Sequence, residues 1–207
     1  MLQVYNRGAE AGVSRICFDE RPCQLLGEVV TPLPMHPGHP KKVDYEYERR
    51  GTCVVLLAYD IDRGQRYCQV RSQRTKQDYA EFIDWLIHTH YSEARHILVV
   101  QDNLNTHTKG AFYEQLPCER AFQLSQLLEF HFTPKHASGL NMAEIEFAAL
   151  TRQCLGGRIA SPSQLRQQVL AWQDNRNQAD VRIRWTFTVD SARQKLERHY
   201  KSVCSKN

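Results

Sequence analysis

Residues 96–103, HILVVQDN, are the most informative segment of this 207-residue chain. The apolar run in this segment is typical of a buried β-strand, and it ends at Asp102 and Asn103, where a polar loop begins. A core strand that ends in this way delivers its last side chains to an edge of a sheet. We therefore expect the Asp102 carboxylate to lie at a sheet edge, within reach of acidic groups from other elements.

Two further segments carry acidic side chains that we expect to meet this carboxylate. In RICFDERP, a short strand over residues 15–18 leads into Asp19 and Glu20. In SGLNMAEIEF, a polar segment leads into a helix that carries Glu144 and Glu146. Carboxylates that converge on one sheet edge repel one another unless a cation lies among them. The usual cation is a divalent metal ion, and the usual chemistry is phosphoryl transfer on nucleic acid.

Periodicity shows that only one residue of each acidic pair can join the site, but it does not show which one. Strand alternation sends Asp19 and Glu20 to opposite faces of the sheet, so only one of them can join the site. On a helix, Glu144 and Glu146 are separated by about 200° and face nearly opposite ways. Either member of each pair is therefore a candidate when only the spacing is considered.

The composition sets broad limits on location and partners. Lys and Arg total 27 and Asp and Glu total 23, so the formal net charge of +4 permits a polyanionic partner without requiring one. The seven cysteines form no C-x-x-C pair, which argues against a disulfide framework or a structural zinc site. No apolar run approaches the roughly 18 residues of a transmembrane helix, and the first residues lack the apolar core of a signal peptide. We expect a cytoplasmic protein with no membrane partner.

The order of the expected elements indicates an α/β fold. A hairpin of strands followed by helix-connected strands predicts a five-stranded mixed sheet flanked by helices, which is the layout of a ribonuclease H-like fold. We expect residues 1–14 to be a loose lead-in and residues 15–207 to form one domain that includes the C-terminal helices. Besides the strands at 15–18 and 96–101, the expected strands cover 51–59, 66–70 and 127–133, and the expected helices cover 75–90, 109–116, 141–155, 161–175 and 190–203.

Five segments together resemble the DDE-type transposases of bacterial insertion sequences, in the mariner-like superfamily. They are CFDERP, YEYERRGTC, RTKQDYAEFIDWL, VVQDNLNTHT and HFTPKHASGLNMAEIEF, and the resemblance runs from about residue 15 to about residue 203. It places the first acid of the family at Asp19, the second at Asp102 and the third at Glu144, three positions after Asn141. It implies that these three carboxylates are catalytic and hold two Mg²⁺ ions, for which Mn²⁺ can substitute.

The resemblance also implies contacts with DNA near the acidic residues. His107 is expected either to contact the scissile phosphate or water, or only to cap the short helix that follows. The residues with possible DNA or phosphate contacts are Asn103, His107, Lys135, His136 and Asn141.

The implied function is metal-dependent DNA strand cleavage and strand transfer during transposition, with transposon ends and target DNA as partners. Only 18 residues precede Asp19, too few for the helix-turn-helix region usual in such transposases. We therefore expect a truncated transposase or the catalytic half of a split one, acting as a homodimer or in a mixed assembly with full-length transposase. Two alternatives remain: a non-catalytic remnant that binds DNA or full-length transposase, and a hydrolytic nuclease of the same fold.

Overall fold

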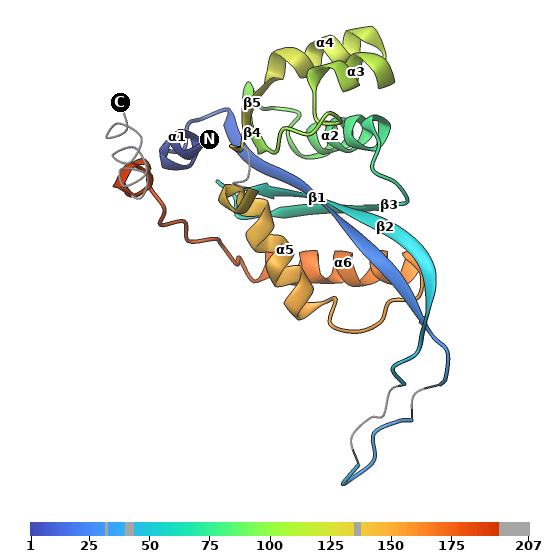
Figure 1. The fold of residues 1–207 in the computed structure, drawn as a ribbon. Coiled ribbons are helices and arrows are strands. Elements are labelled where there is room, and N and C mark those ends of the chain that lie inside the picture. Colours follow the sequence, from blue (N-terminus) through green and yellow to red (C-terminus); the bar gives the residue numbers. More distant parts are fainter. Residues whose placement is uncertain (32, 40–43, 135–137, 195–207) are drawn as a thin grey trace, which may run out of the picture.

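The computed structural model describes residues 1–31, 33–39, 44–134 and 138–194, and it contains a five-stranded mixed sheet with the strand order β3-β2-β1-β4-β5 (Figure 1). Strands β1, β2 and β3 pair antiparallel, whereas β4 pairs parallel with both β1 and β5. This topology confirms the predicted mixed sheet. The strands are β1 (Val13–Glu28), β2 (Tyr47–Asp60), β3 (Arg66–Arg71), β4 (His96–Gln101) and β5 (Leu128–Phe132).

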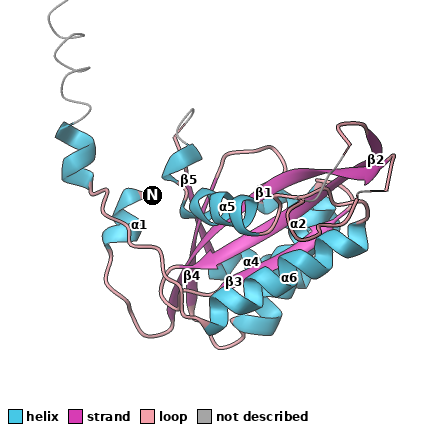
Figure 2. Ribbon diagram, turned by 90° about the horizontal axis from the view of Figure 1, so that it is seen from below, coloured by secondary structure: helices cyan, strands magenta, loops and turns pink. Residues whose placement is uncertain are grey.

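Helices cover both faces of the sheet (Figures 1 and 2). Helices α2, α3 and α4 pack on one face, and α5 and α6 pack on the other, so that the sheet separates two apolar cores. The helices are α1 (Leu2–Asn6), α2 (Lys76–His90), α3 (Lys109–Gln115), α4 (Cys118–Leu127), the short 3-10 helix η1 (Ser138–Leu140), α5 (Met142–Gln153) and α6 (Pro162–Gln178). Among the described residues, no helix has the length and apolar character needed to cross a bilayer.

Helix α2 begins where its sequence predicts. The Thr75 hydroxyl accepts a hydrogen bond from the Asp78 backbone N–H, and the Asp78 carboxylate accepts one from the Thr75 backbone N–H. This reciprocal capping satisfies two N–H groups that would otherwise lack partners at the start of the helix. The cap sets the phase of the helix, so that its apolar stripe, which includes Phe82 and Leu86, is buried against the sheet.

Strand β1 is much longer than predicted. We expected a short strand that ends at Asp19, but β1 continues to Glu28 and pairs with β2 over its whole second half. Pro22 is tolerated there because β4 pairs only with the first part of β1, up to Cys17, so the side of β1 that faces away from β2 is an open edge at Pro22. The β1–β2 hairpin consequently projects beyond the helices (Figure 1).

The N-terminal segment is more ordered than the expected loose lead-in. Residues Leu2–Asn6 form α1, and Val4 is buried in the core beneath α5. The Tyr5 hydroxyl donates a hydrogen bond to the Leu140 carbonyl at 2.9 Å, and the Tyr5 ring packs edge-on against Trp185. Helix α1 therefore belongs to the packed body of the protein.

Two further helices differ from their predictions. Helix α4 was not predicted, because Pro117 indicates the end of α3; the same proline is the N-cap residue of α4, a position where its missing N–H has no cost. The expected last helix over 190–203 is helical from 189 to 194, and its remainder lies outside the described residues.

Candidate functional site

Strand register places Asp19 beside Asp102. Strands β1 and β4 are parallel, and Cys17 lies opposite Val100 in their register. Advancing both strands by two residues brings Asp19 next to Asp102, immediately beyond the end of β4. We had expected Asp19 at the end of the strand, but it lies within β1. It does lie beyond the last residue of β1 that pairs with β4.

The third acid is brought to the same place by the start of α5. Asn141 caps this helix, because its Oδ1 accepts a hydrogen bond from the Ala143 backbone N–H. The Asn141 side-chain amide also donates to the Phe18 carbonyl at 2.9 Å, which fixes the start of α5 against β1 one residue before Asp19. Glu144 lies in the first turn of α5. Asn141 is 1% exposed, so in this structure it bridges α5 and β1, and its possible contact with DNA stays a prediction.

The electrostatics of Asp19 show that the three acids influence one another. Burial, and after it the negative charges of Glu144 and Asp102, raise the pKa of the Asp19 carboxyl to about 7 against the opposing effects of the Glu20 backbone N–H and His107. Near neutral pH, a carboxyl group with this pKa is ionised in about half of the molecules. A bound cation would favour the charged form and relieve the repulsion among the three acids.

Glu20 points away from these acids, as strand alternation predicts. Its Oε1 lies 3.2 Å from Arg74 Nε, and its Oε2 lies 3.4 Å from His107 Nε2 on the α2 side of the sheet. Glu20 therefore does not join Asp19.

Glu146 also points away from the site. It is completely buried between Arg66 and Arg176. The sequence gives no local signal for this arrangement, because Arg66 is 80 residues away in the chain. Glu144 is thus the member of the pair whose negative charge acts on Asp19 and raises its pKa.

His107 has a third role that we had not considered. It is fully buried, and its Nδ1 lies 2.6 Å from Asp102 Oδ1. Burial lowers the pKa of the His107 imidazole, but the hydrogen bonds to Asp102 and Glu20 outweigh burial and raise it to about 9. His107 therefore contacts Asp102 from within the protein and is not placed to contact DNA.

The remaining predicted contacts are only partly visible. Asn103 is exposed directly beside Asp102, so its contact with DNA stays a prediction. Lys135 and His136 lie outside the described residues.

The comparisons with known proteins agree with this geometry. A family model described as DDE superfamily endonuclease matches residues 14–166, which is most of the chain and includes all three acids. The chain belongs to the DDE superfamily endonucleases. No curated protein matches the chain at a significant level.

Solved structures similar to this family member share its fold. A Mos1 mariner paired end complex with Mn is 14% identical with a TM-score of 0.58, and the match covers 86% of this chain and 53% of that one. The catalytic domain of Mos1 mariner transposase is 12% identical with a TM-score of 0.56, and the match covers 84% and 75%. A Mos1 strand transfer complex is 15% identical with a TM-score of 0.55, and the match covers 77% and 47%. The fold is thus ribonuclease H-like, and this chain spans about half the length of the Mos1 chains in the complexes.

The carboxylate oxygens of Asp19, Asp102 and Glu144 suit divalent cations such as Mg²⁺, which prefers carboxylate oxygens and keeps several water ligands. Within the described part of the chain, no three His, Cys, Asp or Glu side chains are placed to hold one metal ion together. Mg²⁺ is commonly bound by one or two carboxylates, with water and substrate phosphate completing its coordination. Asp19, Asp102 and Glu144 are the residues that would hold such ions, because a cation among them would relieve the repulsion that raises the pKa of Asp19.

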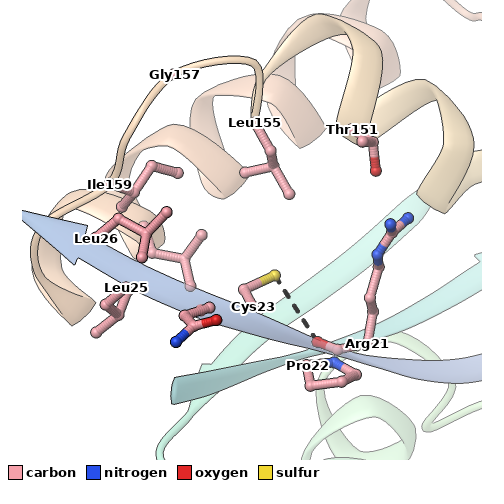
Figure 3. A pocket seen from close by; sticks show the side chains of 11 residues that line it. Arg21, Pro22, Cys23, Leu25, Leu26, Thr151, Leu155, Gly157 and Ile159 are labelled. Carbon is pink, nitrogen blue, oxygen red and sulfur yellow. Dashed lines mark hydrogen bonds between the residues drawn. The ribbon is translucent and has the colours of Figure 1, made fainter. Parts of the chain in front are cut away.

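The structure also contains a separate hollow that lies between the second half of β1 and the segment that follows α5 (Figure 3). Its lining includes apolar residues such as Leu25, Leu155 and Ile159 together with polar ones such as Arg21 and Thr151. None of the three acids lines it. This hollow is therefore separate from the candidate site formed by the three acids.

Proposed function

We propose that this chain is the catalytic domain of a DDE transposase that performs metal-dependent DNA strand cleavage and strand transfer. The observation that carries the proposal is the register of β1 and β4, which places Asp19 beside Asp102, while Asn141 fixes the helix that carries Glu144 to the same part of β1. The family match and the Mos1 structures, which are transposon-end and strand transfer complexes, support this activity.

Each acid has a distinct part in the proposed mechanism. Asp19 would be shared by two Mg²⁺ or Mn²⁺ ions, with Asp102 a ligand of one and Glu144 a ligand of the other. When bound, such a pair of ions supplies a nucleophilic water or hydroxyl and neutralises the charge that develops on the phosphate. The protein itself keeps the acids in place: the buried end of β4 positions Asp102, and the capped first turn of α5 positions Glu144.

The proposed partners follow from this chemistry. The substrates are the ends of a transposon and a target DNA, and the resemblance of the sequence motifs suggests a bacterial insertion sequence as their source. The functional assembly would contain a second copy of this chain or a longer transposase chain. Asn103, exposed next to Asp102, is the described residue best placed to contact the scissile strand.

Plasmid nicking tests the proposal. The purified chain should nick supercoiled plasmid in the presence of Mn²⁺ and lose this activity in EDTA and in Asp102→Asn. Asp84→Asn is the matched control, since Asp84 pairs with Arg120 on the surface and lies in α2. Nicking by Asp102→Asn at the wild-type rate would refute the catalytic assignment.

A second assay separates the alternatives. An oligonucleotide with a free 3′-hydroxyl, cut from a transposon end, should be joined to target plasmid by a transposase. Nicking without joining would indicate the hydrolytic nuclease. Binding of DNA with neither reaction would indicate the non-catalytic alternative.

A further inference from the structure

His107 lies at the centre of a chain of polar contacts that joins Asp102 to Glu20 and Arg74. On one side, its Nδ1 lies 2.6 Å from Asp102 Oδ1. On the other side, its Nε2 lies 3.4 Å from Glu20 Oε2, and the second oxygen of Glu20 lies 3.2 Å from Arg74 Nε. An ionised carboxylate can only accept hydrogen bonds, so the Nδ1 atom must carry the hydrogen that is donated to Asp102.

The imidazole ring has little freedom to move. It packs edge-on against Phe18, with the ring centroids 5.2 Å apart, and lies tilted against Tyr79 at 4.8 Å. The backbone of His107 is held as well, because its carbonyl accepts a hydrogen bond from the Gln101 side chain at 2.9 Å. The Tyr79 hydroxyl donates to the same Gln101 side chain at 2.9 Å, which fixes the amide. Elements β1, β4 and α2 thus all hold this one histidine.

Asp102, by contrast, has few contacts of its own. It follows the last residue of β4, and its side chain is 29% exposed. Within the described part of the chain, its carboxylate makes hydrogen bonds only through Oδ1, to His107. The second oxygen is left to bind a ligand. A carboxylate on a loop that is held at one oxygen by a rigid donor has one preferred orientation.

We propose that His107 is a positioning residue, which holds the Asp102 carboxylate in the orientation that binds metal. The inference rests on the proposed function, because it assumes that Asp102 is a metal ligand. Outer contacts of this kind fix the direction of a ligand, and their loss commonly weakens metal affinity by about 10–100-fold. Glu20, which shares a strand with Asp19 but faces the other side, lies 3.4 Å from the far nitrogen of His107 and can form an ion pair with it.

The test compares variants that differ only in the donor to Asp102. In Glu20→Gln/His107→Phe, an aromatic ring still packs on Phe18 and Tyr79, but there is no donor, and the buried charge of Glu20 is also removed. Glu20→Gln alone is the matched control, since glutamine still offers an oxygen to Nε2. In His107→Asn, the side-chain amide lies where Nδ1 lies, so the donor to Asp102 is retained.

The main measurement is Mn²⁺ affinity without DNA, from the electron paramagnetic resonance signal of the free ion, together with thermal melts. We expect Glu20→Gln/His107→Phe to bind Mn²⁺ about 10–100-fold more weakly than Glu20→Gln. We expect His107→Asn to recover most of the wild-type affinity. Equal affinity in the double variant and Glu20→Gln would overturn the positioning role, as would a loss in His107→Asn as large as in the double variant.

A second readout does not depend on metal and remains informative if the double variant fails to fold. In ¹⁵N-labelled protein, the Nδ1–H proton of His107 should give a far-downfield NMR signal that moves in Asp102→Asn and persists in Glu20→Gln. The proposed contact would be overturned if the wild type lacked that signal, or if the chemical shift of the signal did not change in Asp102→Asn. Equal Mn²⁺ binding by the wild type and Asp102→Asn would instead overturn the proposed function, and the positioning role with it, even though the NMR contact is present.

Discussion

Arg66 and Glu146 form a bidentate ion pair in which both nitrogen–oxygen distances are 2.7 Å and neither side chain is exposed. Arg176 reaches the same carboxylate at 3.2 and 3.3 Å. The pair joins β3 to α5, and because Glu146 is separated from Glu144 by about 200° around the helix, it also fixes Glu144 on the opposite side of α5. The rotation of α5 is therefore set by a buried ion pair and not by apolar contacts alone.

The first prediction distinguishes the two glutamates. Glu144→Gln should abolish Mn²⁺-dependent nicking while melting close to the wild type, because it neutralises a proposed metal ligand that is only partly buried. Glu146→Gln should lower the free energy of unfolding by about 3–5 kcal/mol, because it leaves the buried Arg66 without its counter-charge. Nicking rates and chemical denaturation of both variants check this. A Glu146→Gln variant with wild-type stability would show that the pair does not hold α5.

The second prediction concerns the pH dependence of stability. The pKa of Asp19 is raised from 3.8 to about 7, so the folded protein retains a proton that the unfolded chain releases. In EDTA, this group should make the protein less stable as pH rises from about 4 to about 7, by at most about 1.4 kcal/mol per pH unit. Asp19→Asn should remove this decline and be more stable than the wild type at pH 7.5. Denaturation curves at several pH values, with Asp84→Asn as control, measure the effect, and parallel curves for the wild type and Asp19→Asn would contradict it.

The same protonation predicts how metal affects stability. Mg²⁺ should raise the melting temperature more at pH 8 than at pH 6, because the ion competes with the proton on Asp19. The increase should be absent in Asp19→Asn at both values. Differential scanning fluorimetry over a range of Mg²⁺ concentrations is sufficient to detect it, and an equal increase in the variant would place the ion elsewhere.

The fourth prediction concerns the contact between α1 and the segment before α5. Tyr5→Phe removes the hydroxyl that donates to the Leu140 carbonyl and should cost about 1 kcal/mol of stability. It should also speed hydrogen exchange in residues 138–144, because that segment loses an anchor. Tyr113→Phe is a suitable control, since Tyr113 is an exposed tyrosine on α3. Unchanged exchange in residues 138–144 would mean that packing alone holds the segment.

The fifth prediction concerns DNA affinity. With a net charge of only +4, we expect weak and salt-dependent binding that does not distinguish sequences, with a dissociation constant on the order of 10⁻⁴–10⁻⁶ M at physiological salt. A mobility-shift titration at several salt concentrations measures it. Nanomolar binding to one sequence would reveal a recognition element that we have not identified.

The parts of the fold that could be predicted from the sequence are those with local causes. The capping box of Thr75 and the apolar run before Asp102 depend on neighbouring residues, and both lie where expected. The length of β1 could not be predicted, because Pro22 is acceptable only where β4 has ended, and the end of that pairing is not visible in the local sequence. The separation of Glu144 from Glu146 followed from helix geometry, but the burial of Glu146 depended on distant arginines.

The contacts of Arg66 have a further consequence for where the functional unit ends. The Arg66 guanidinium donates to the Val181 carbonyl, and the Arg66 backbone N–H donates to the Asn177 side chain at 2.9 Å. The Arg66–Glu146 pair is therefore itself held by residues after 166. The family match stops at residue 166 and includes all three acids. A fragment trimmed to that boundary would keep every acid and the Arg66–Glu146 pair, but it would lose Asn177 and Val181, which hold Arg66, and Arg176, which also reaches Glu146. The set of residues that holds α5 in place therefore extends at least to Val181.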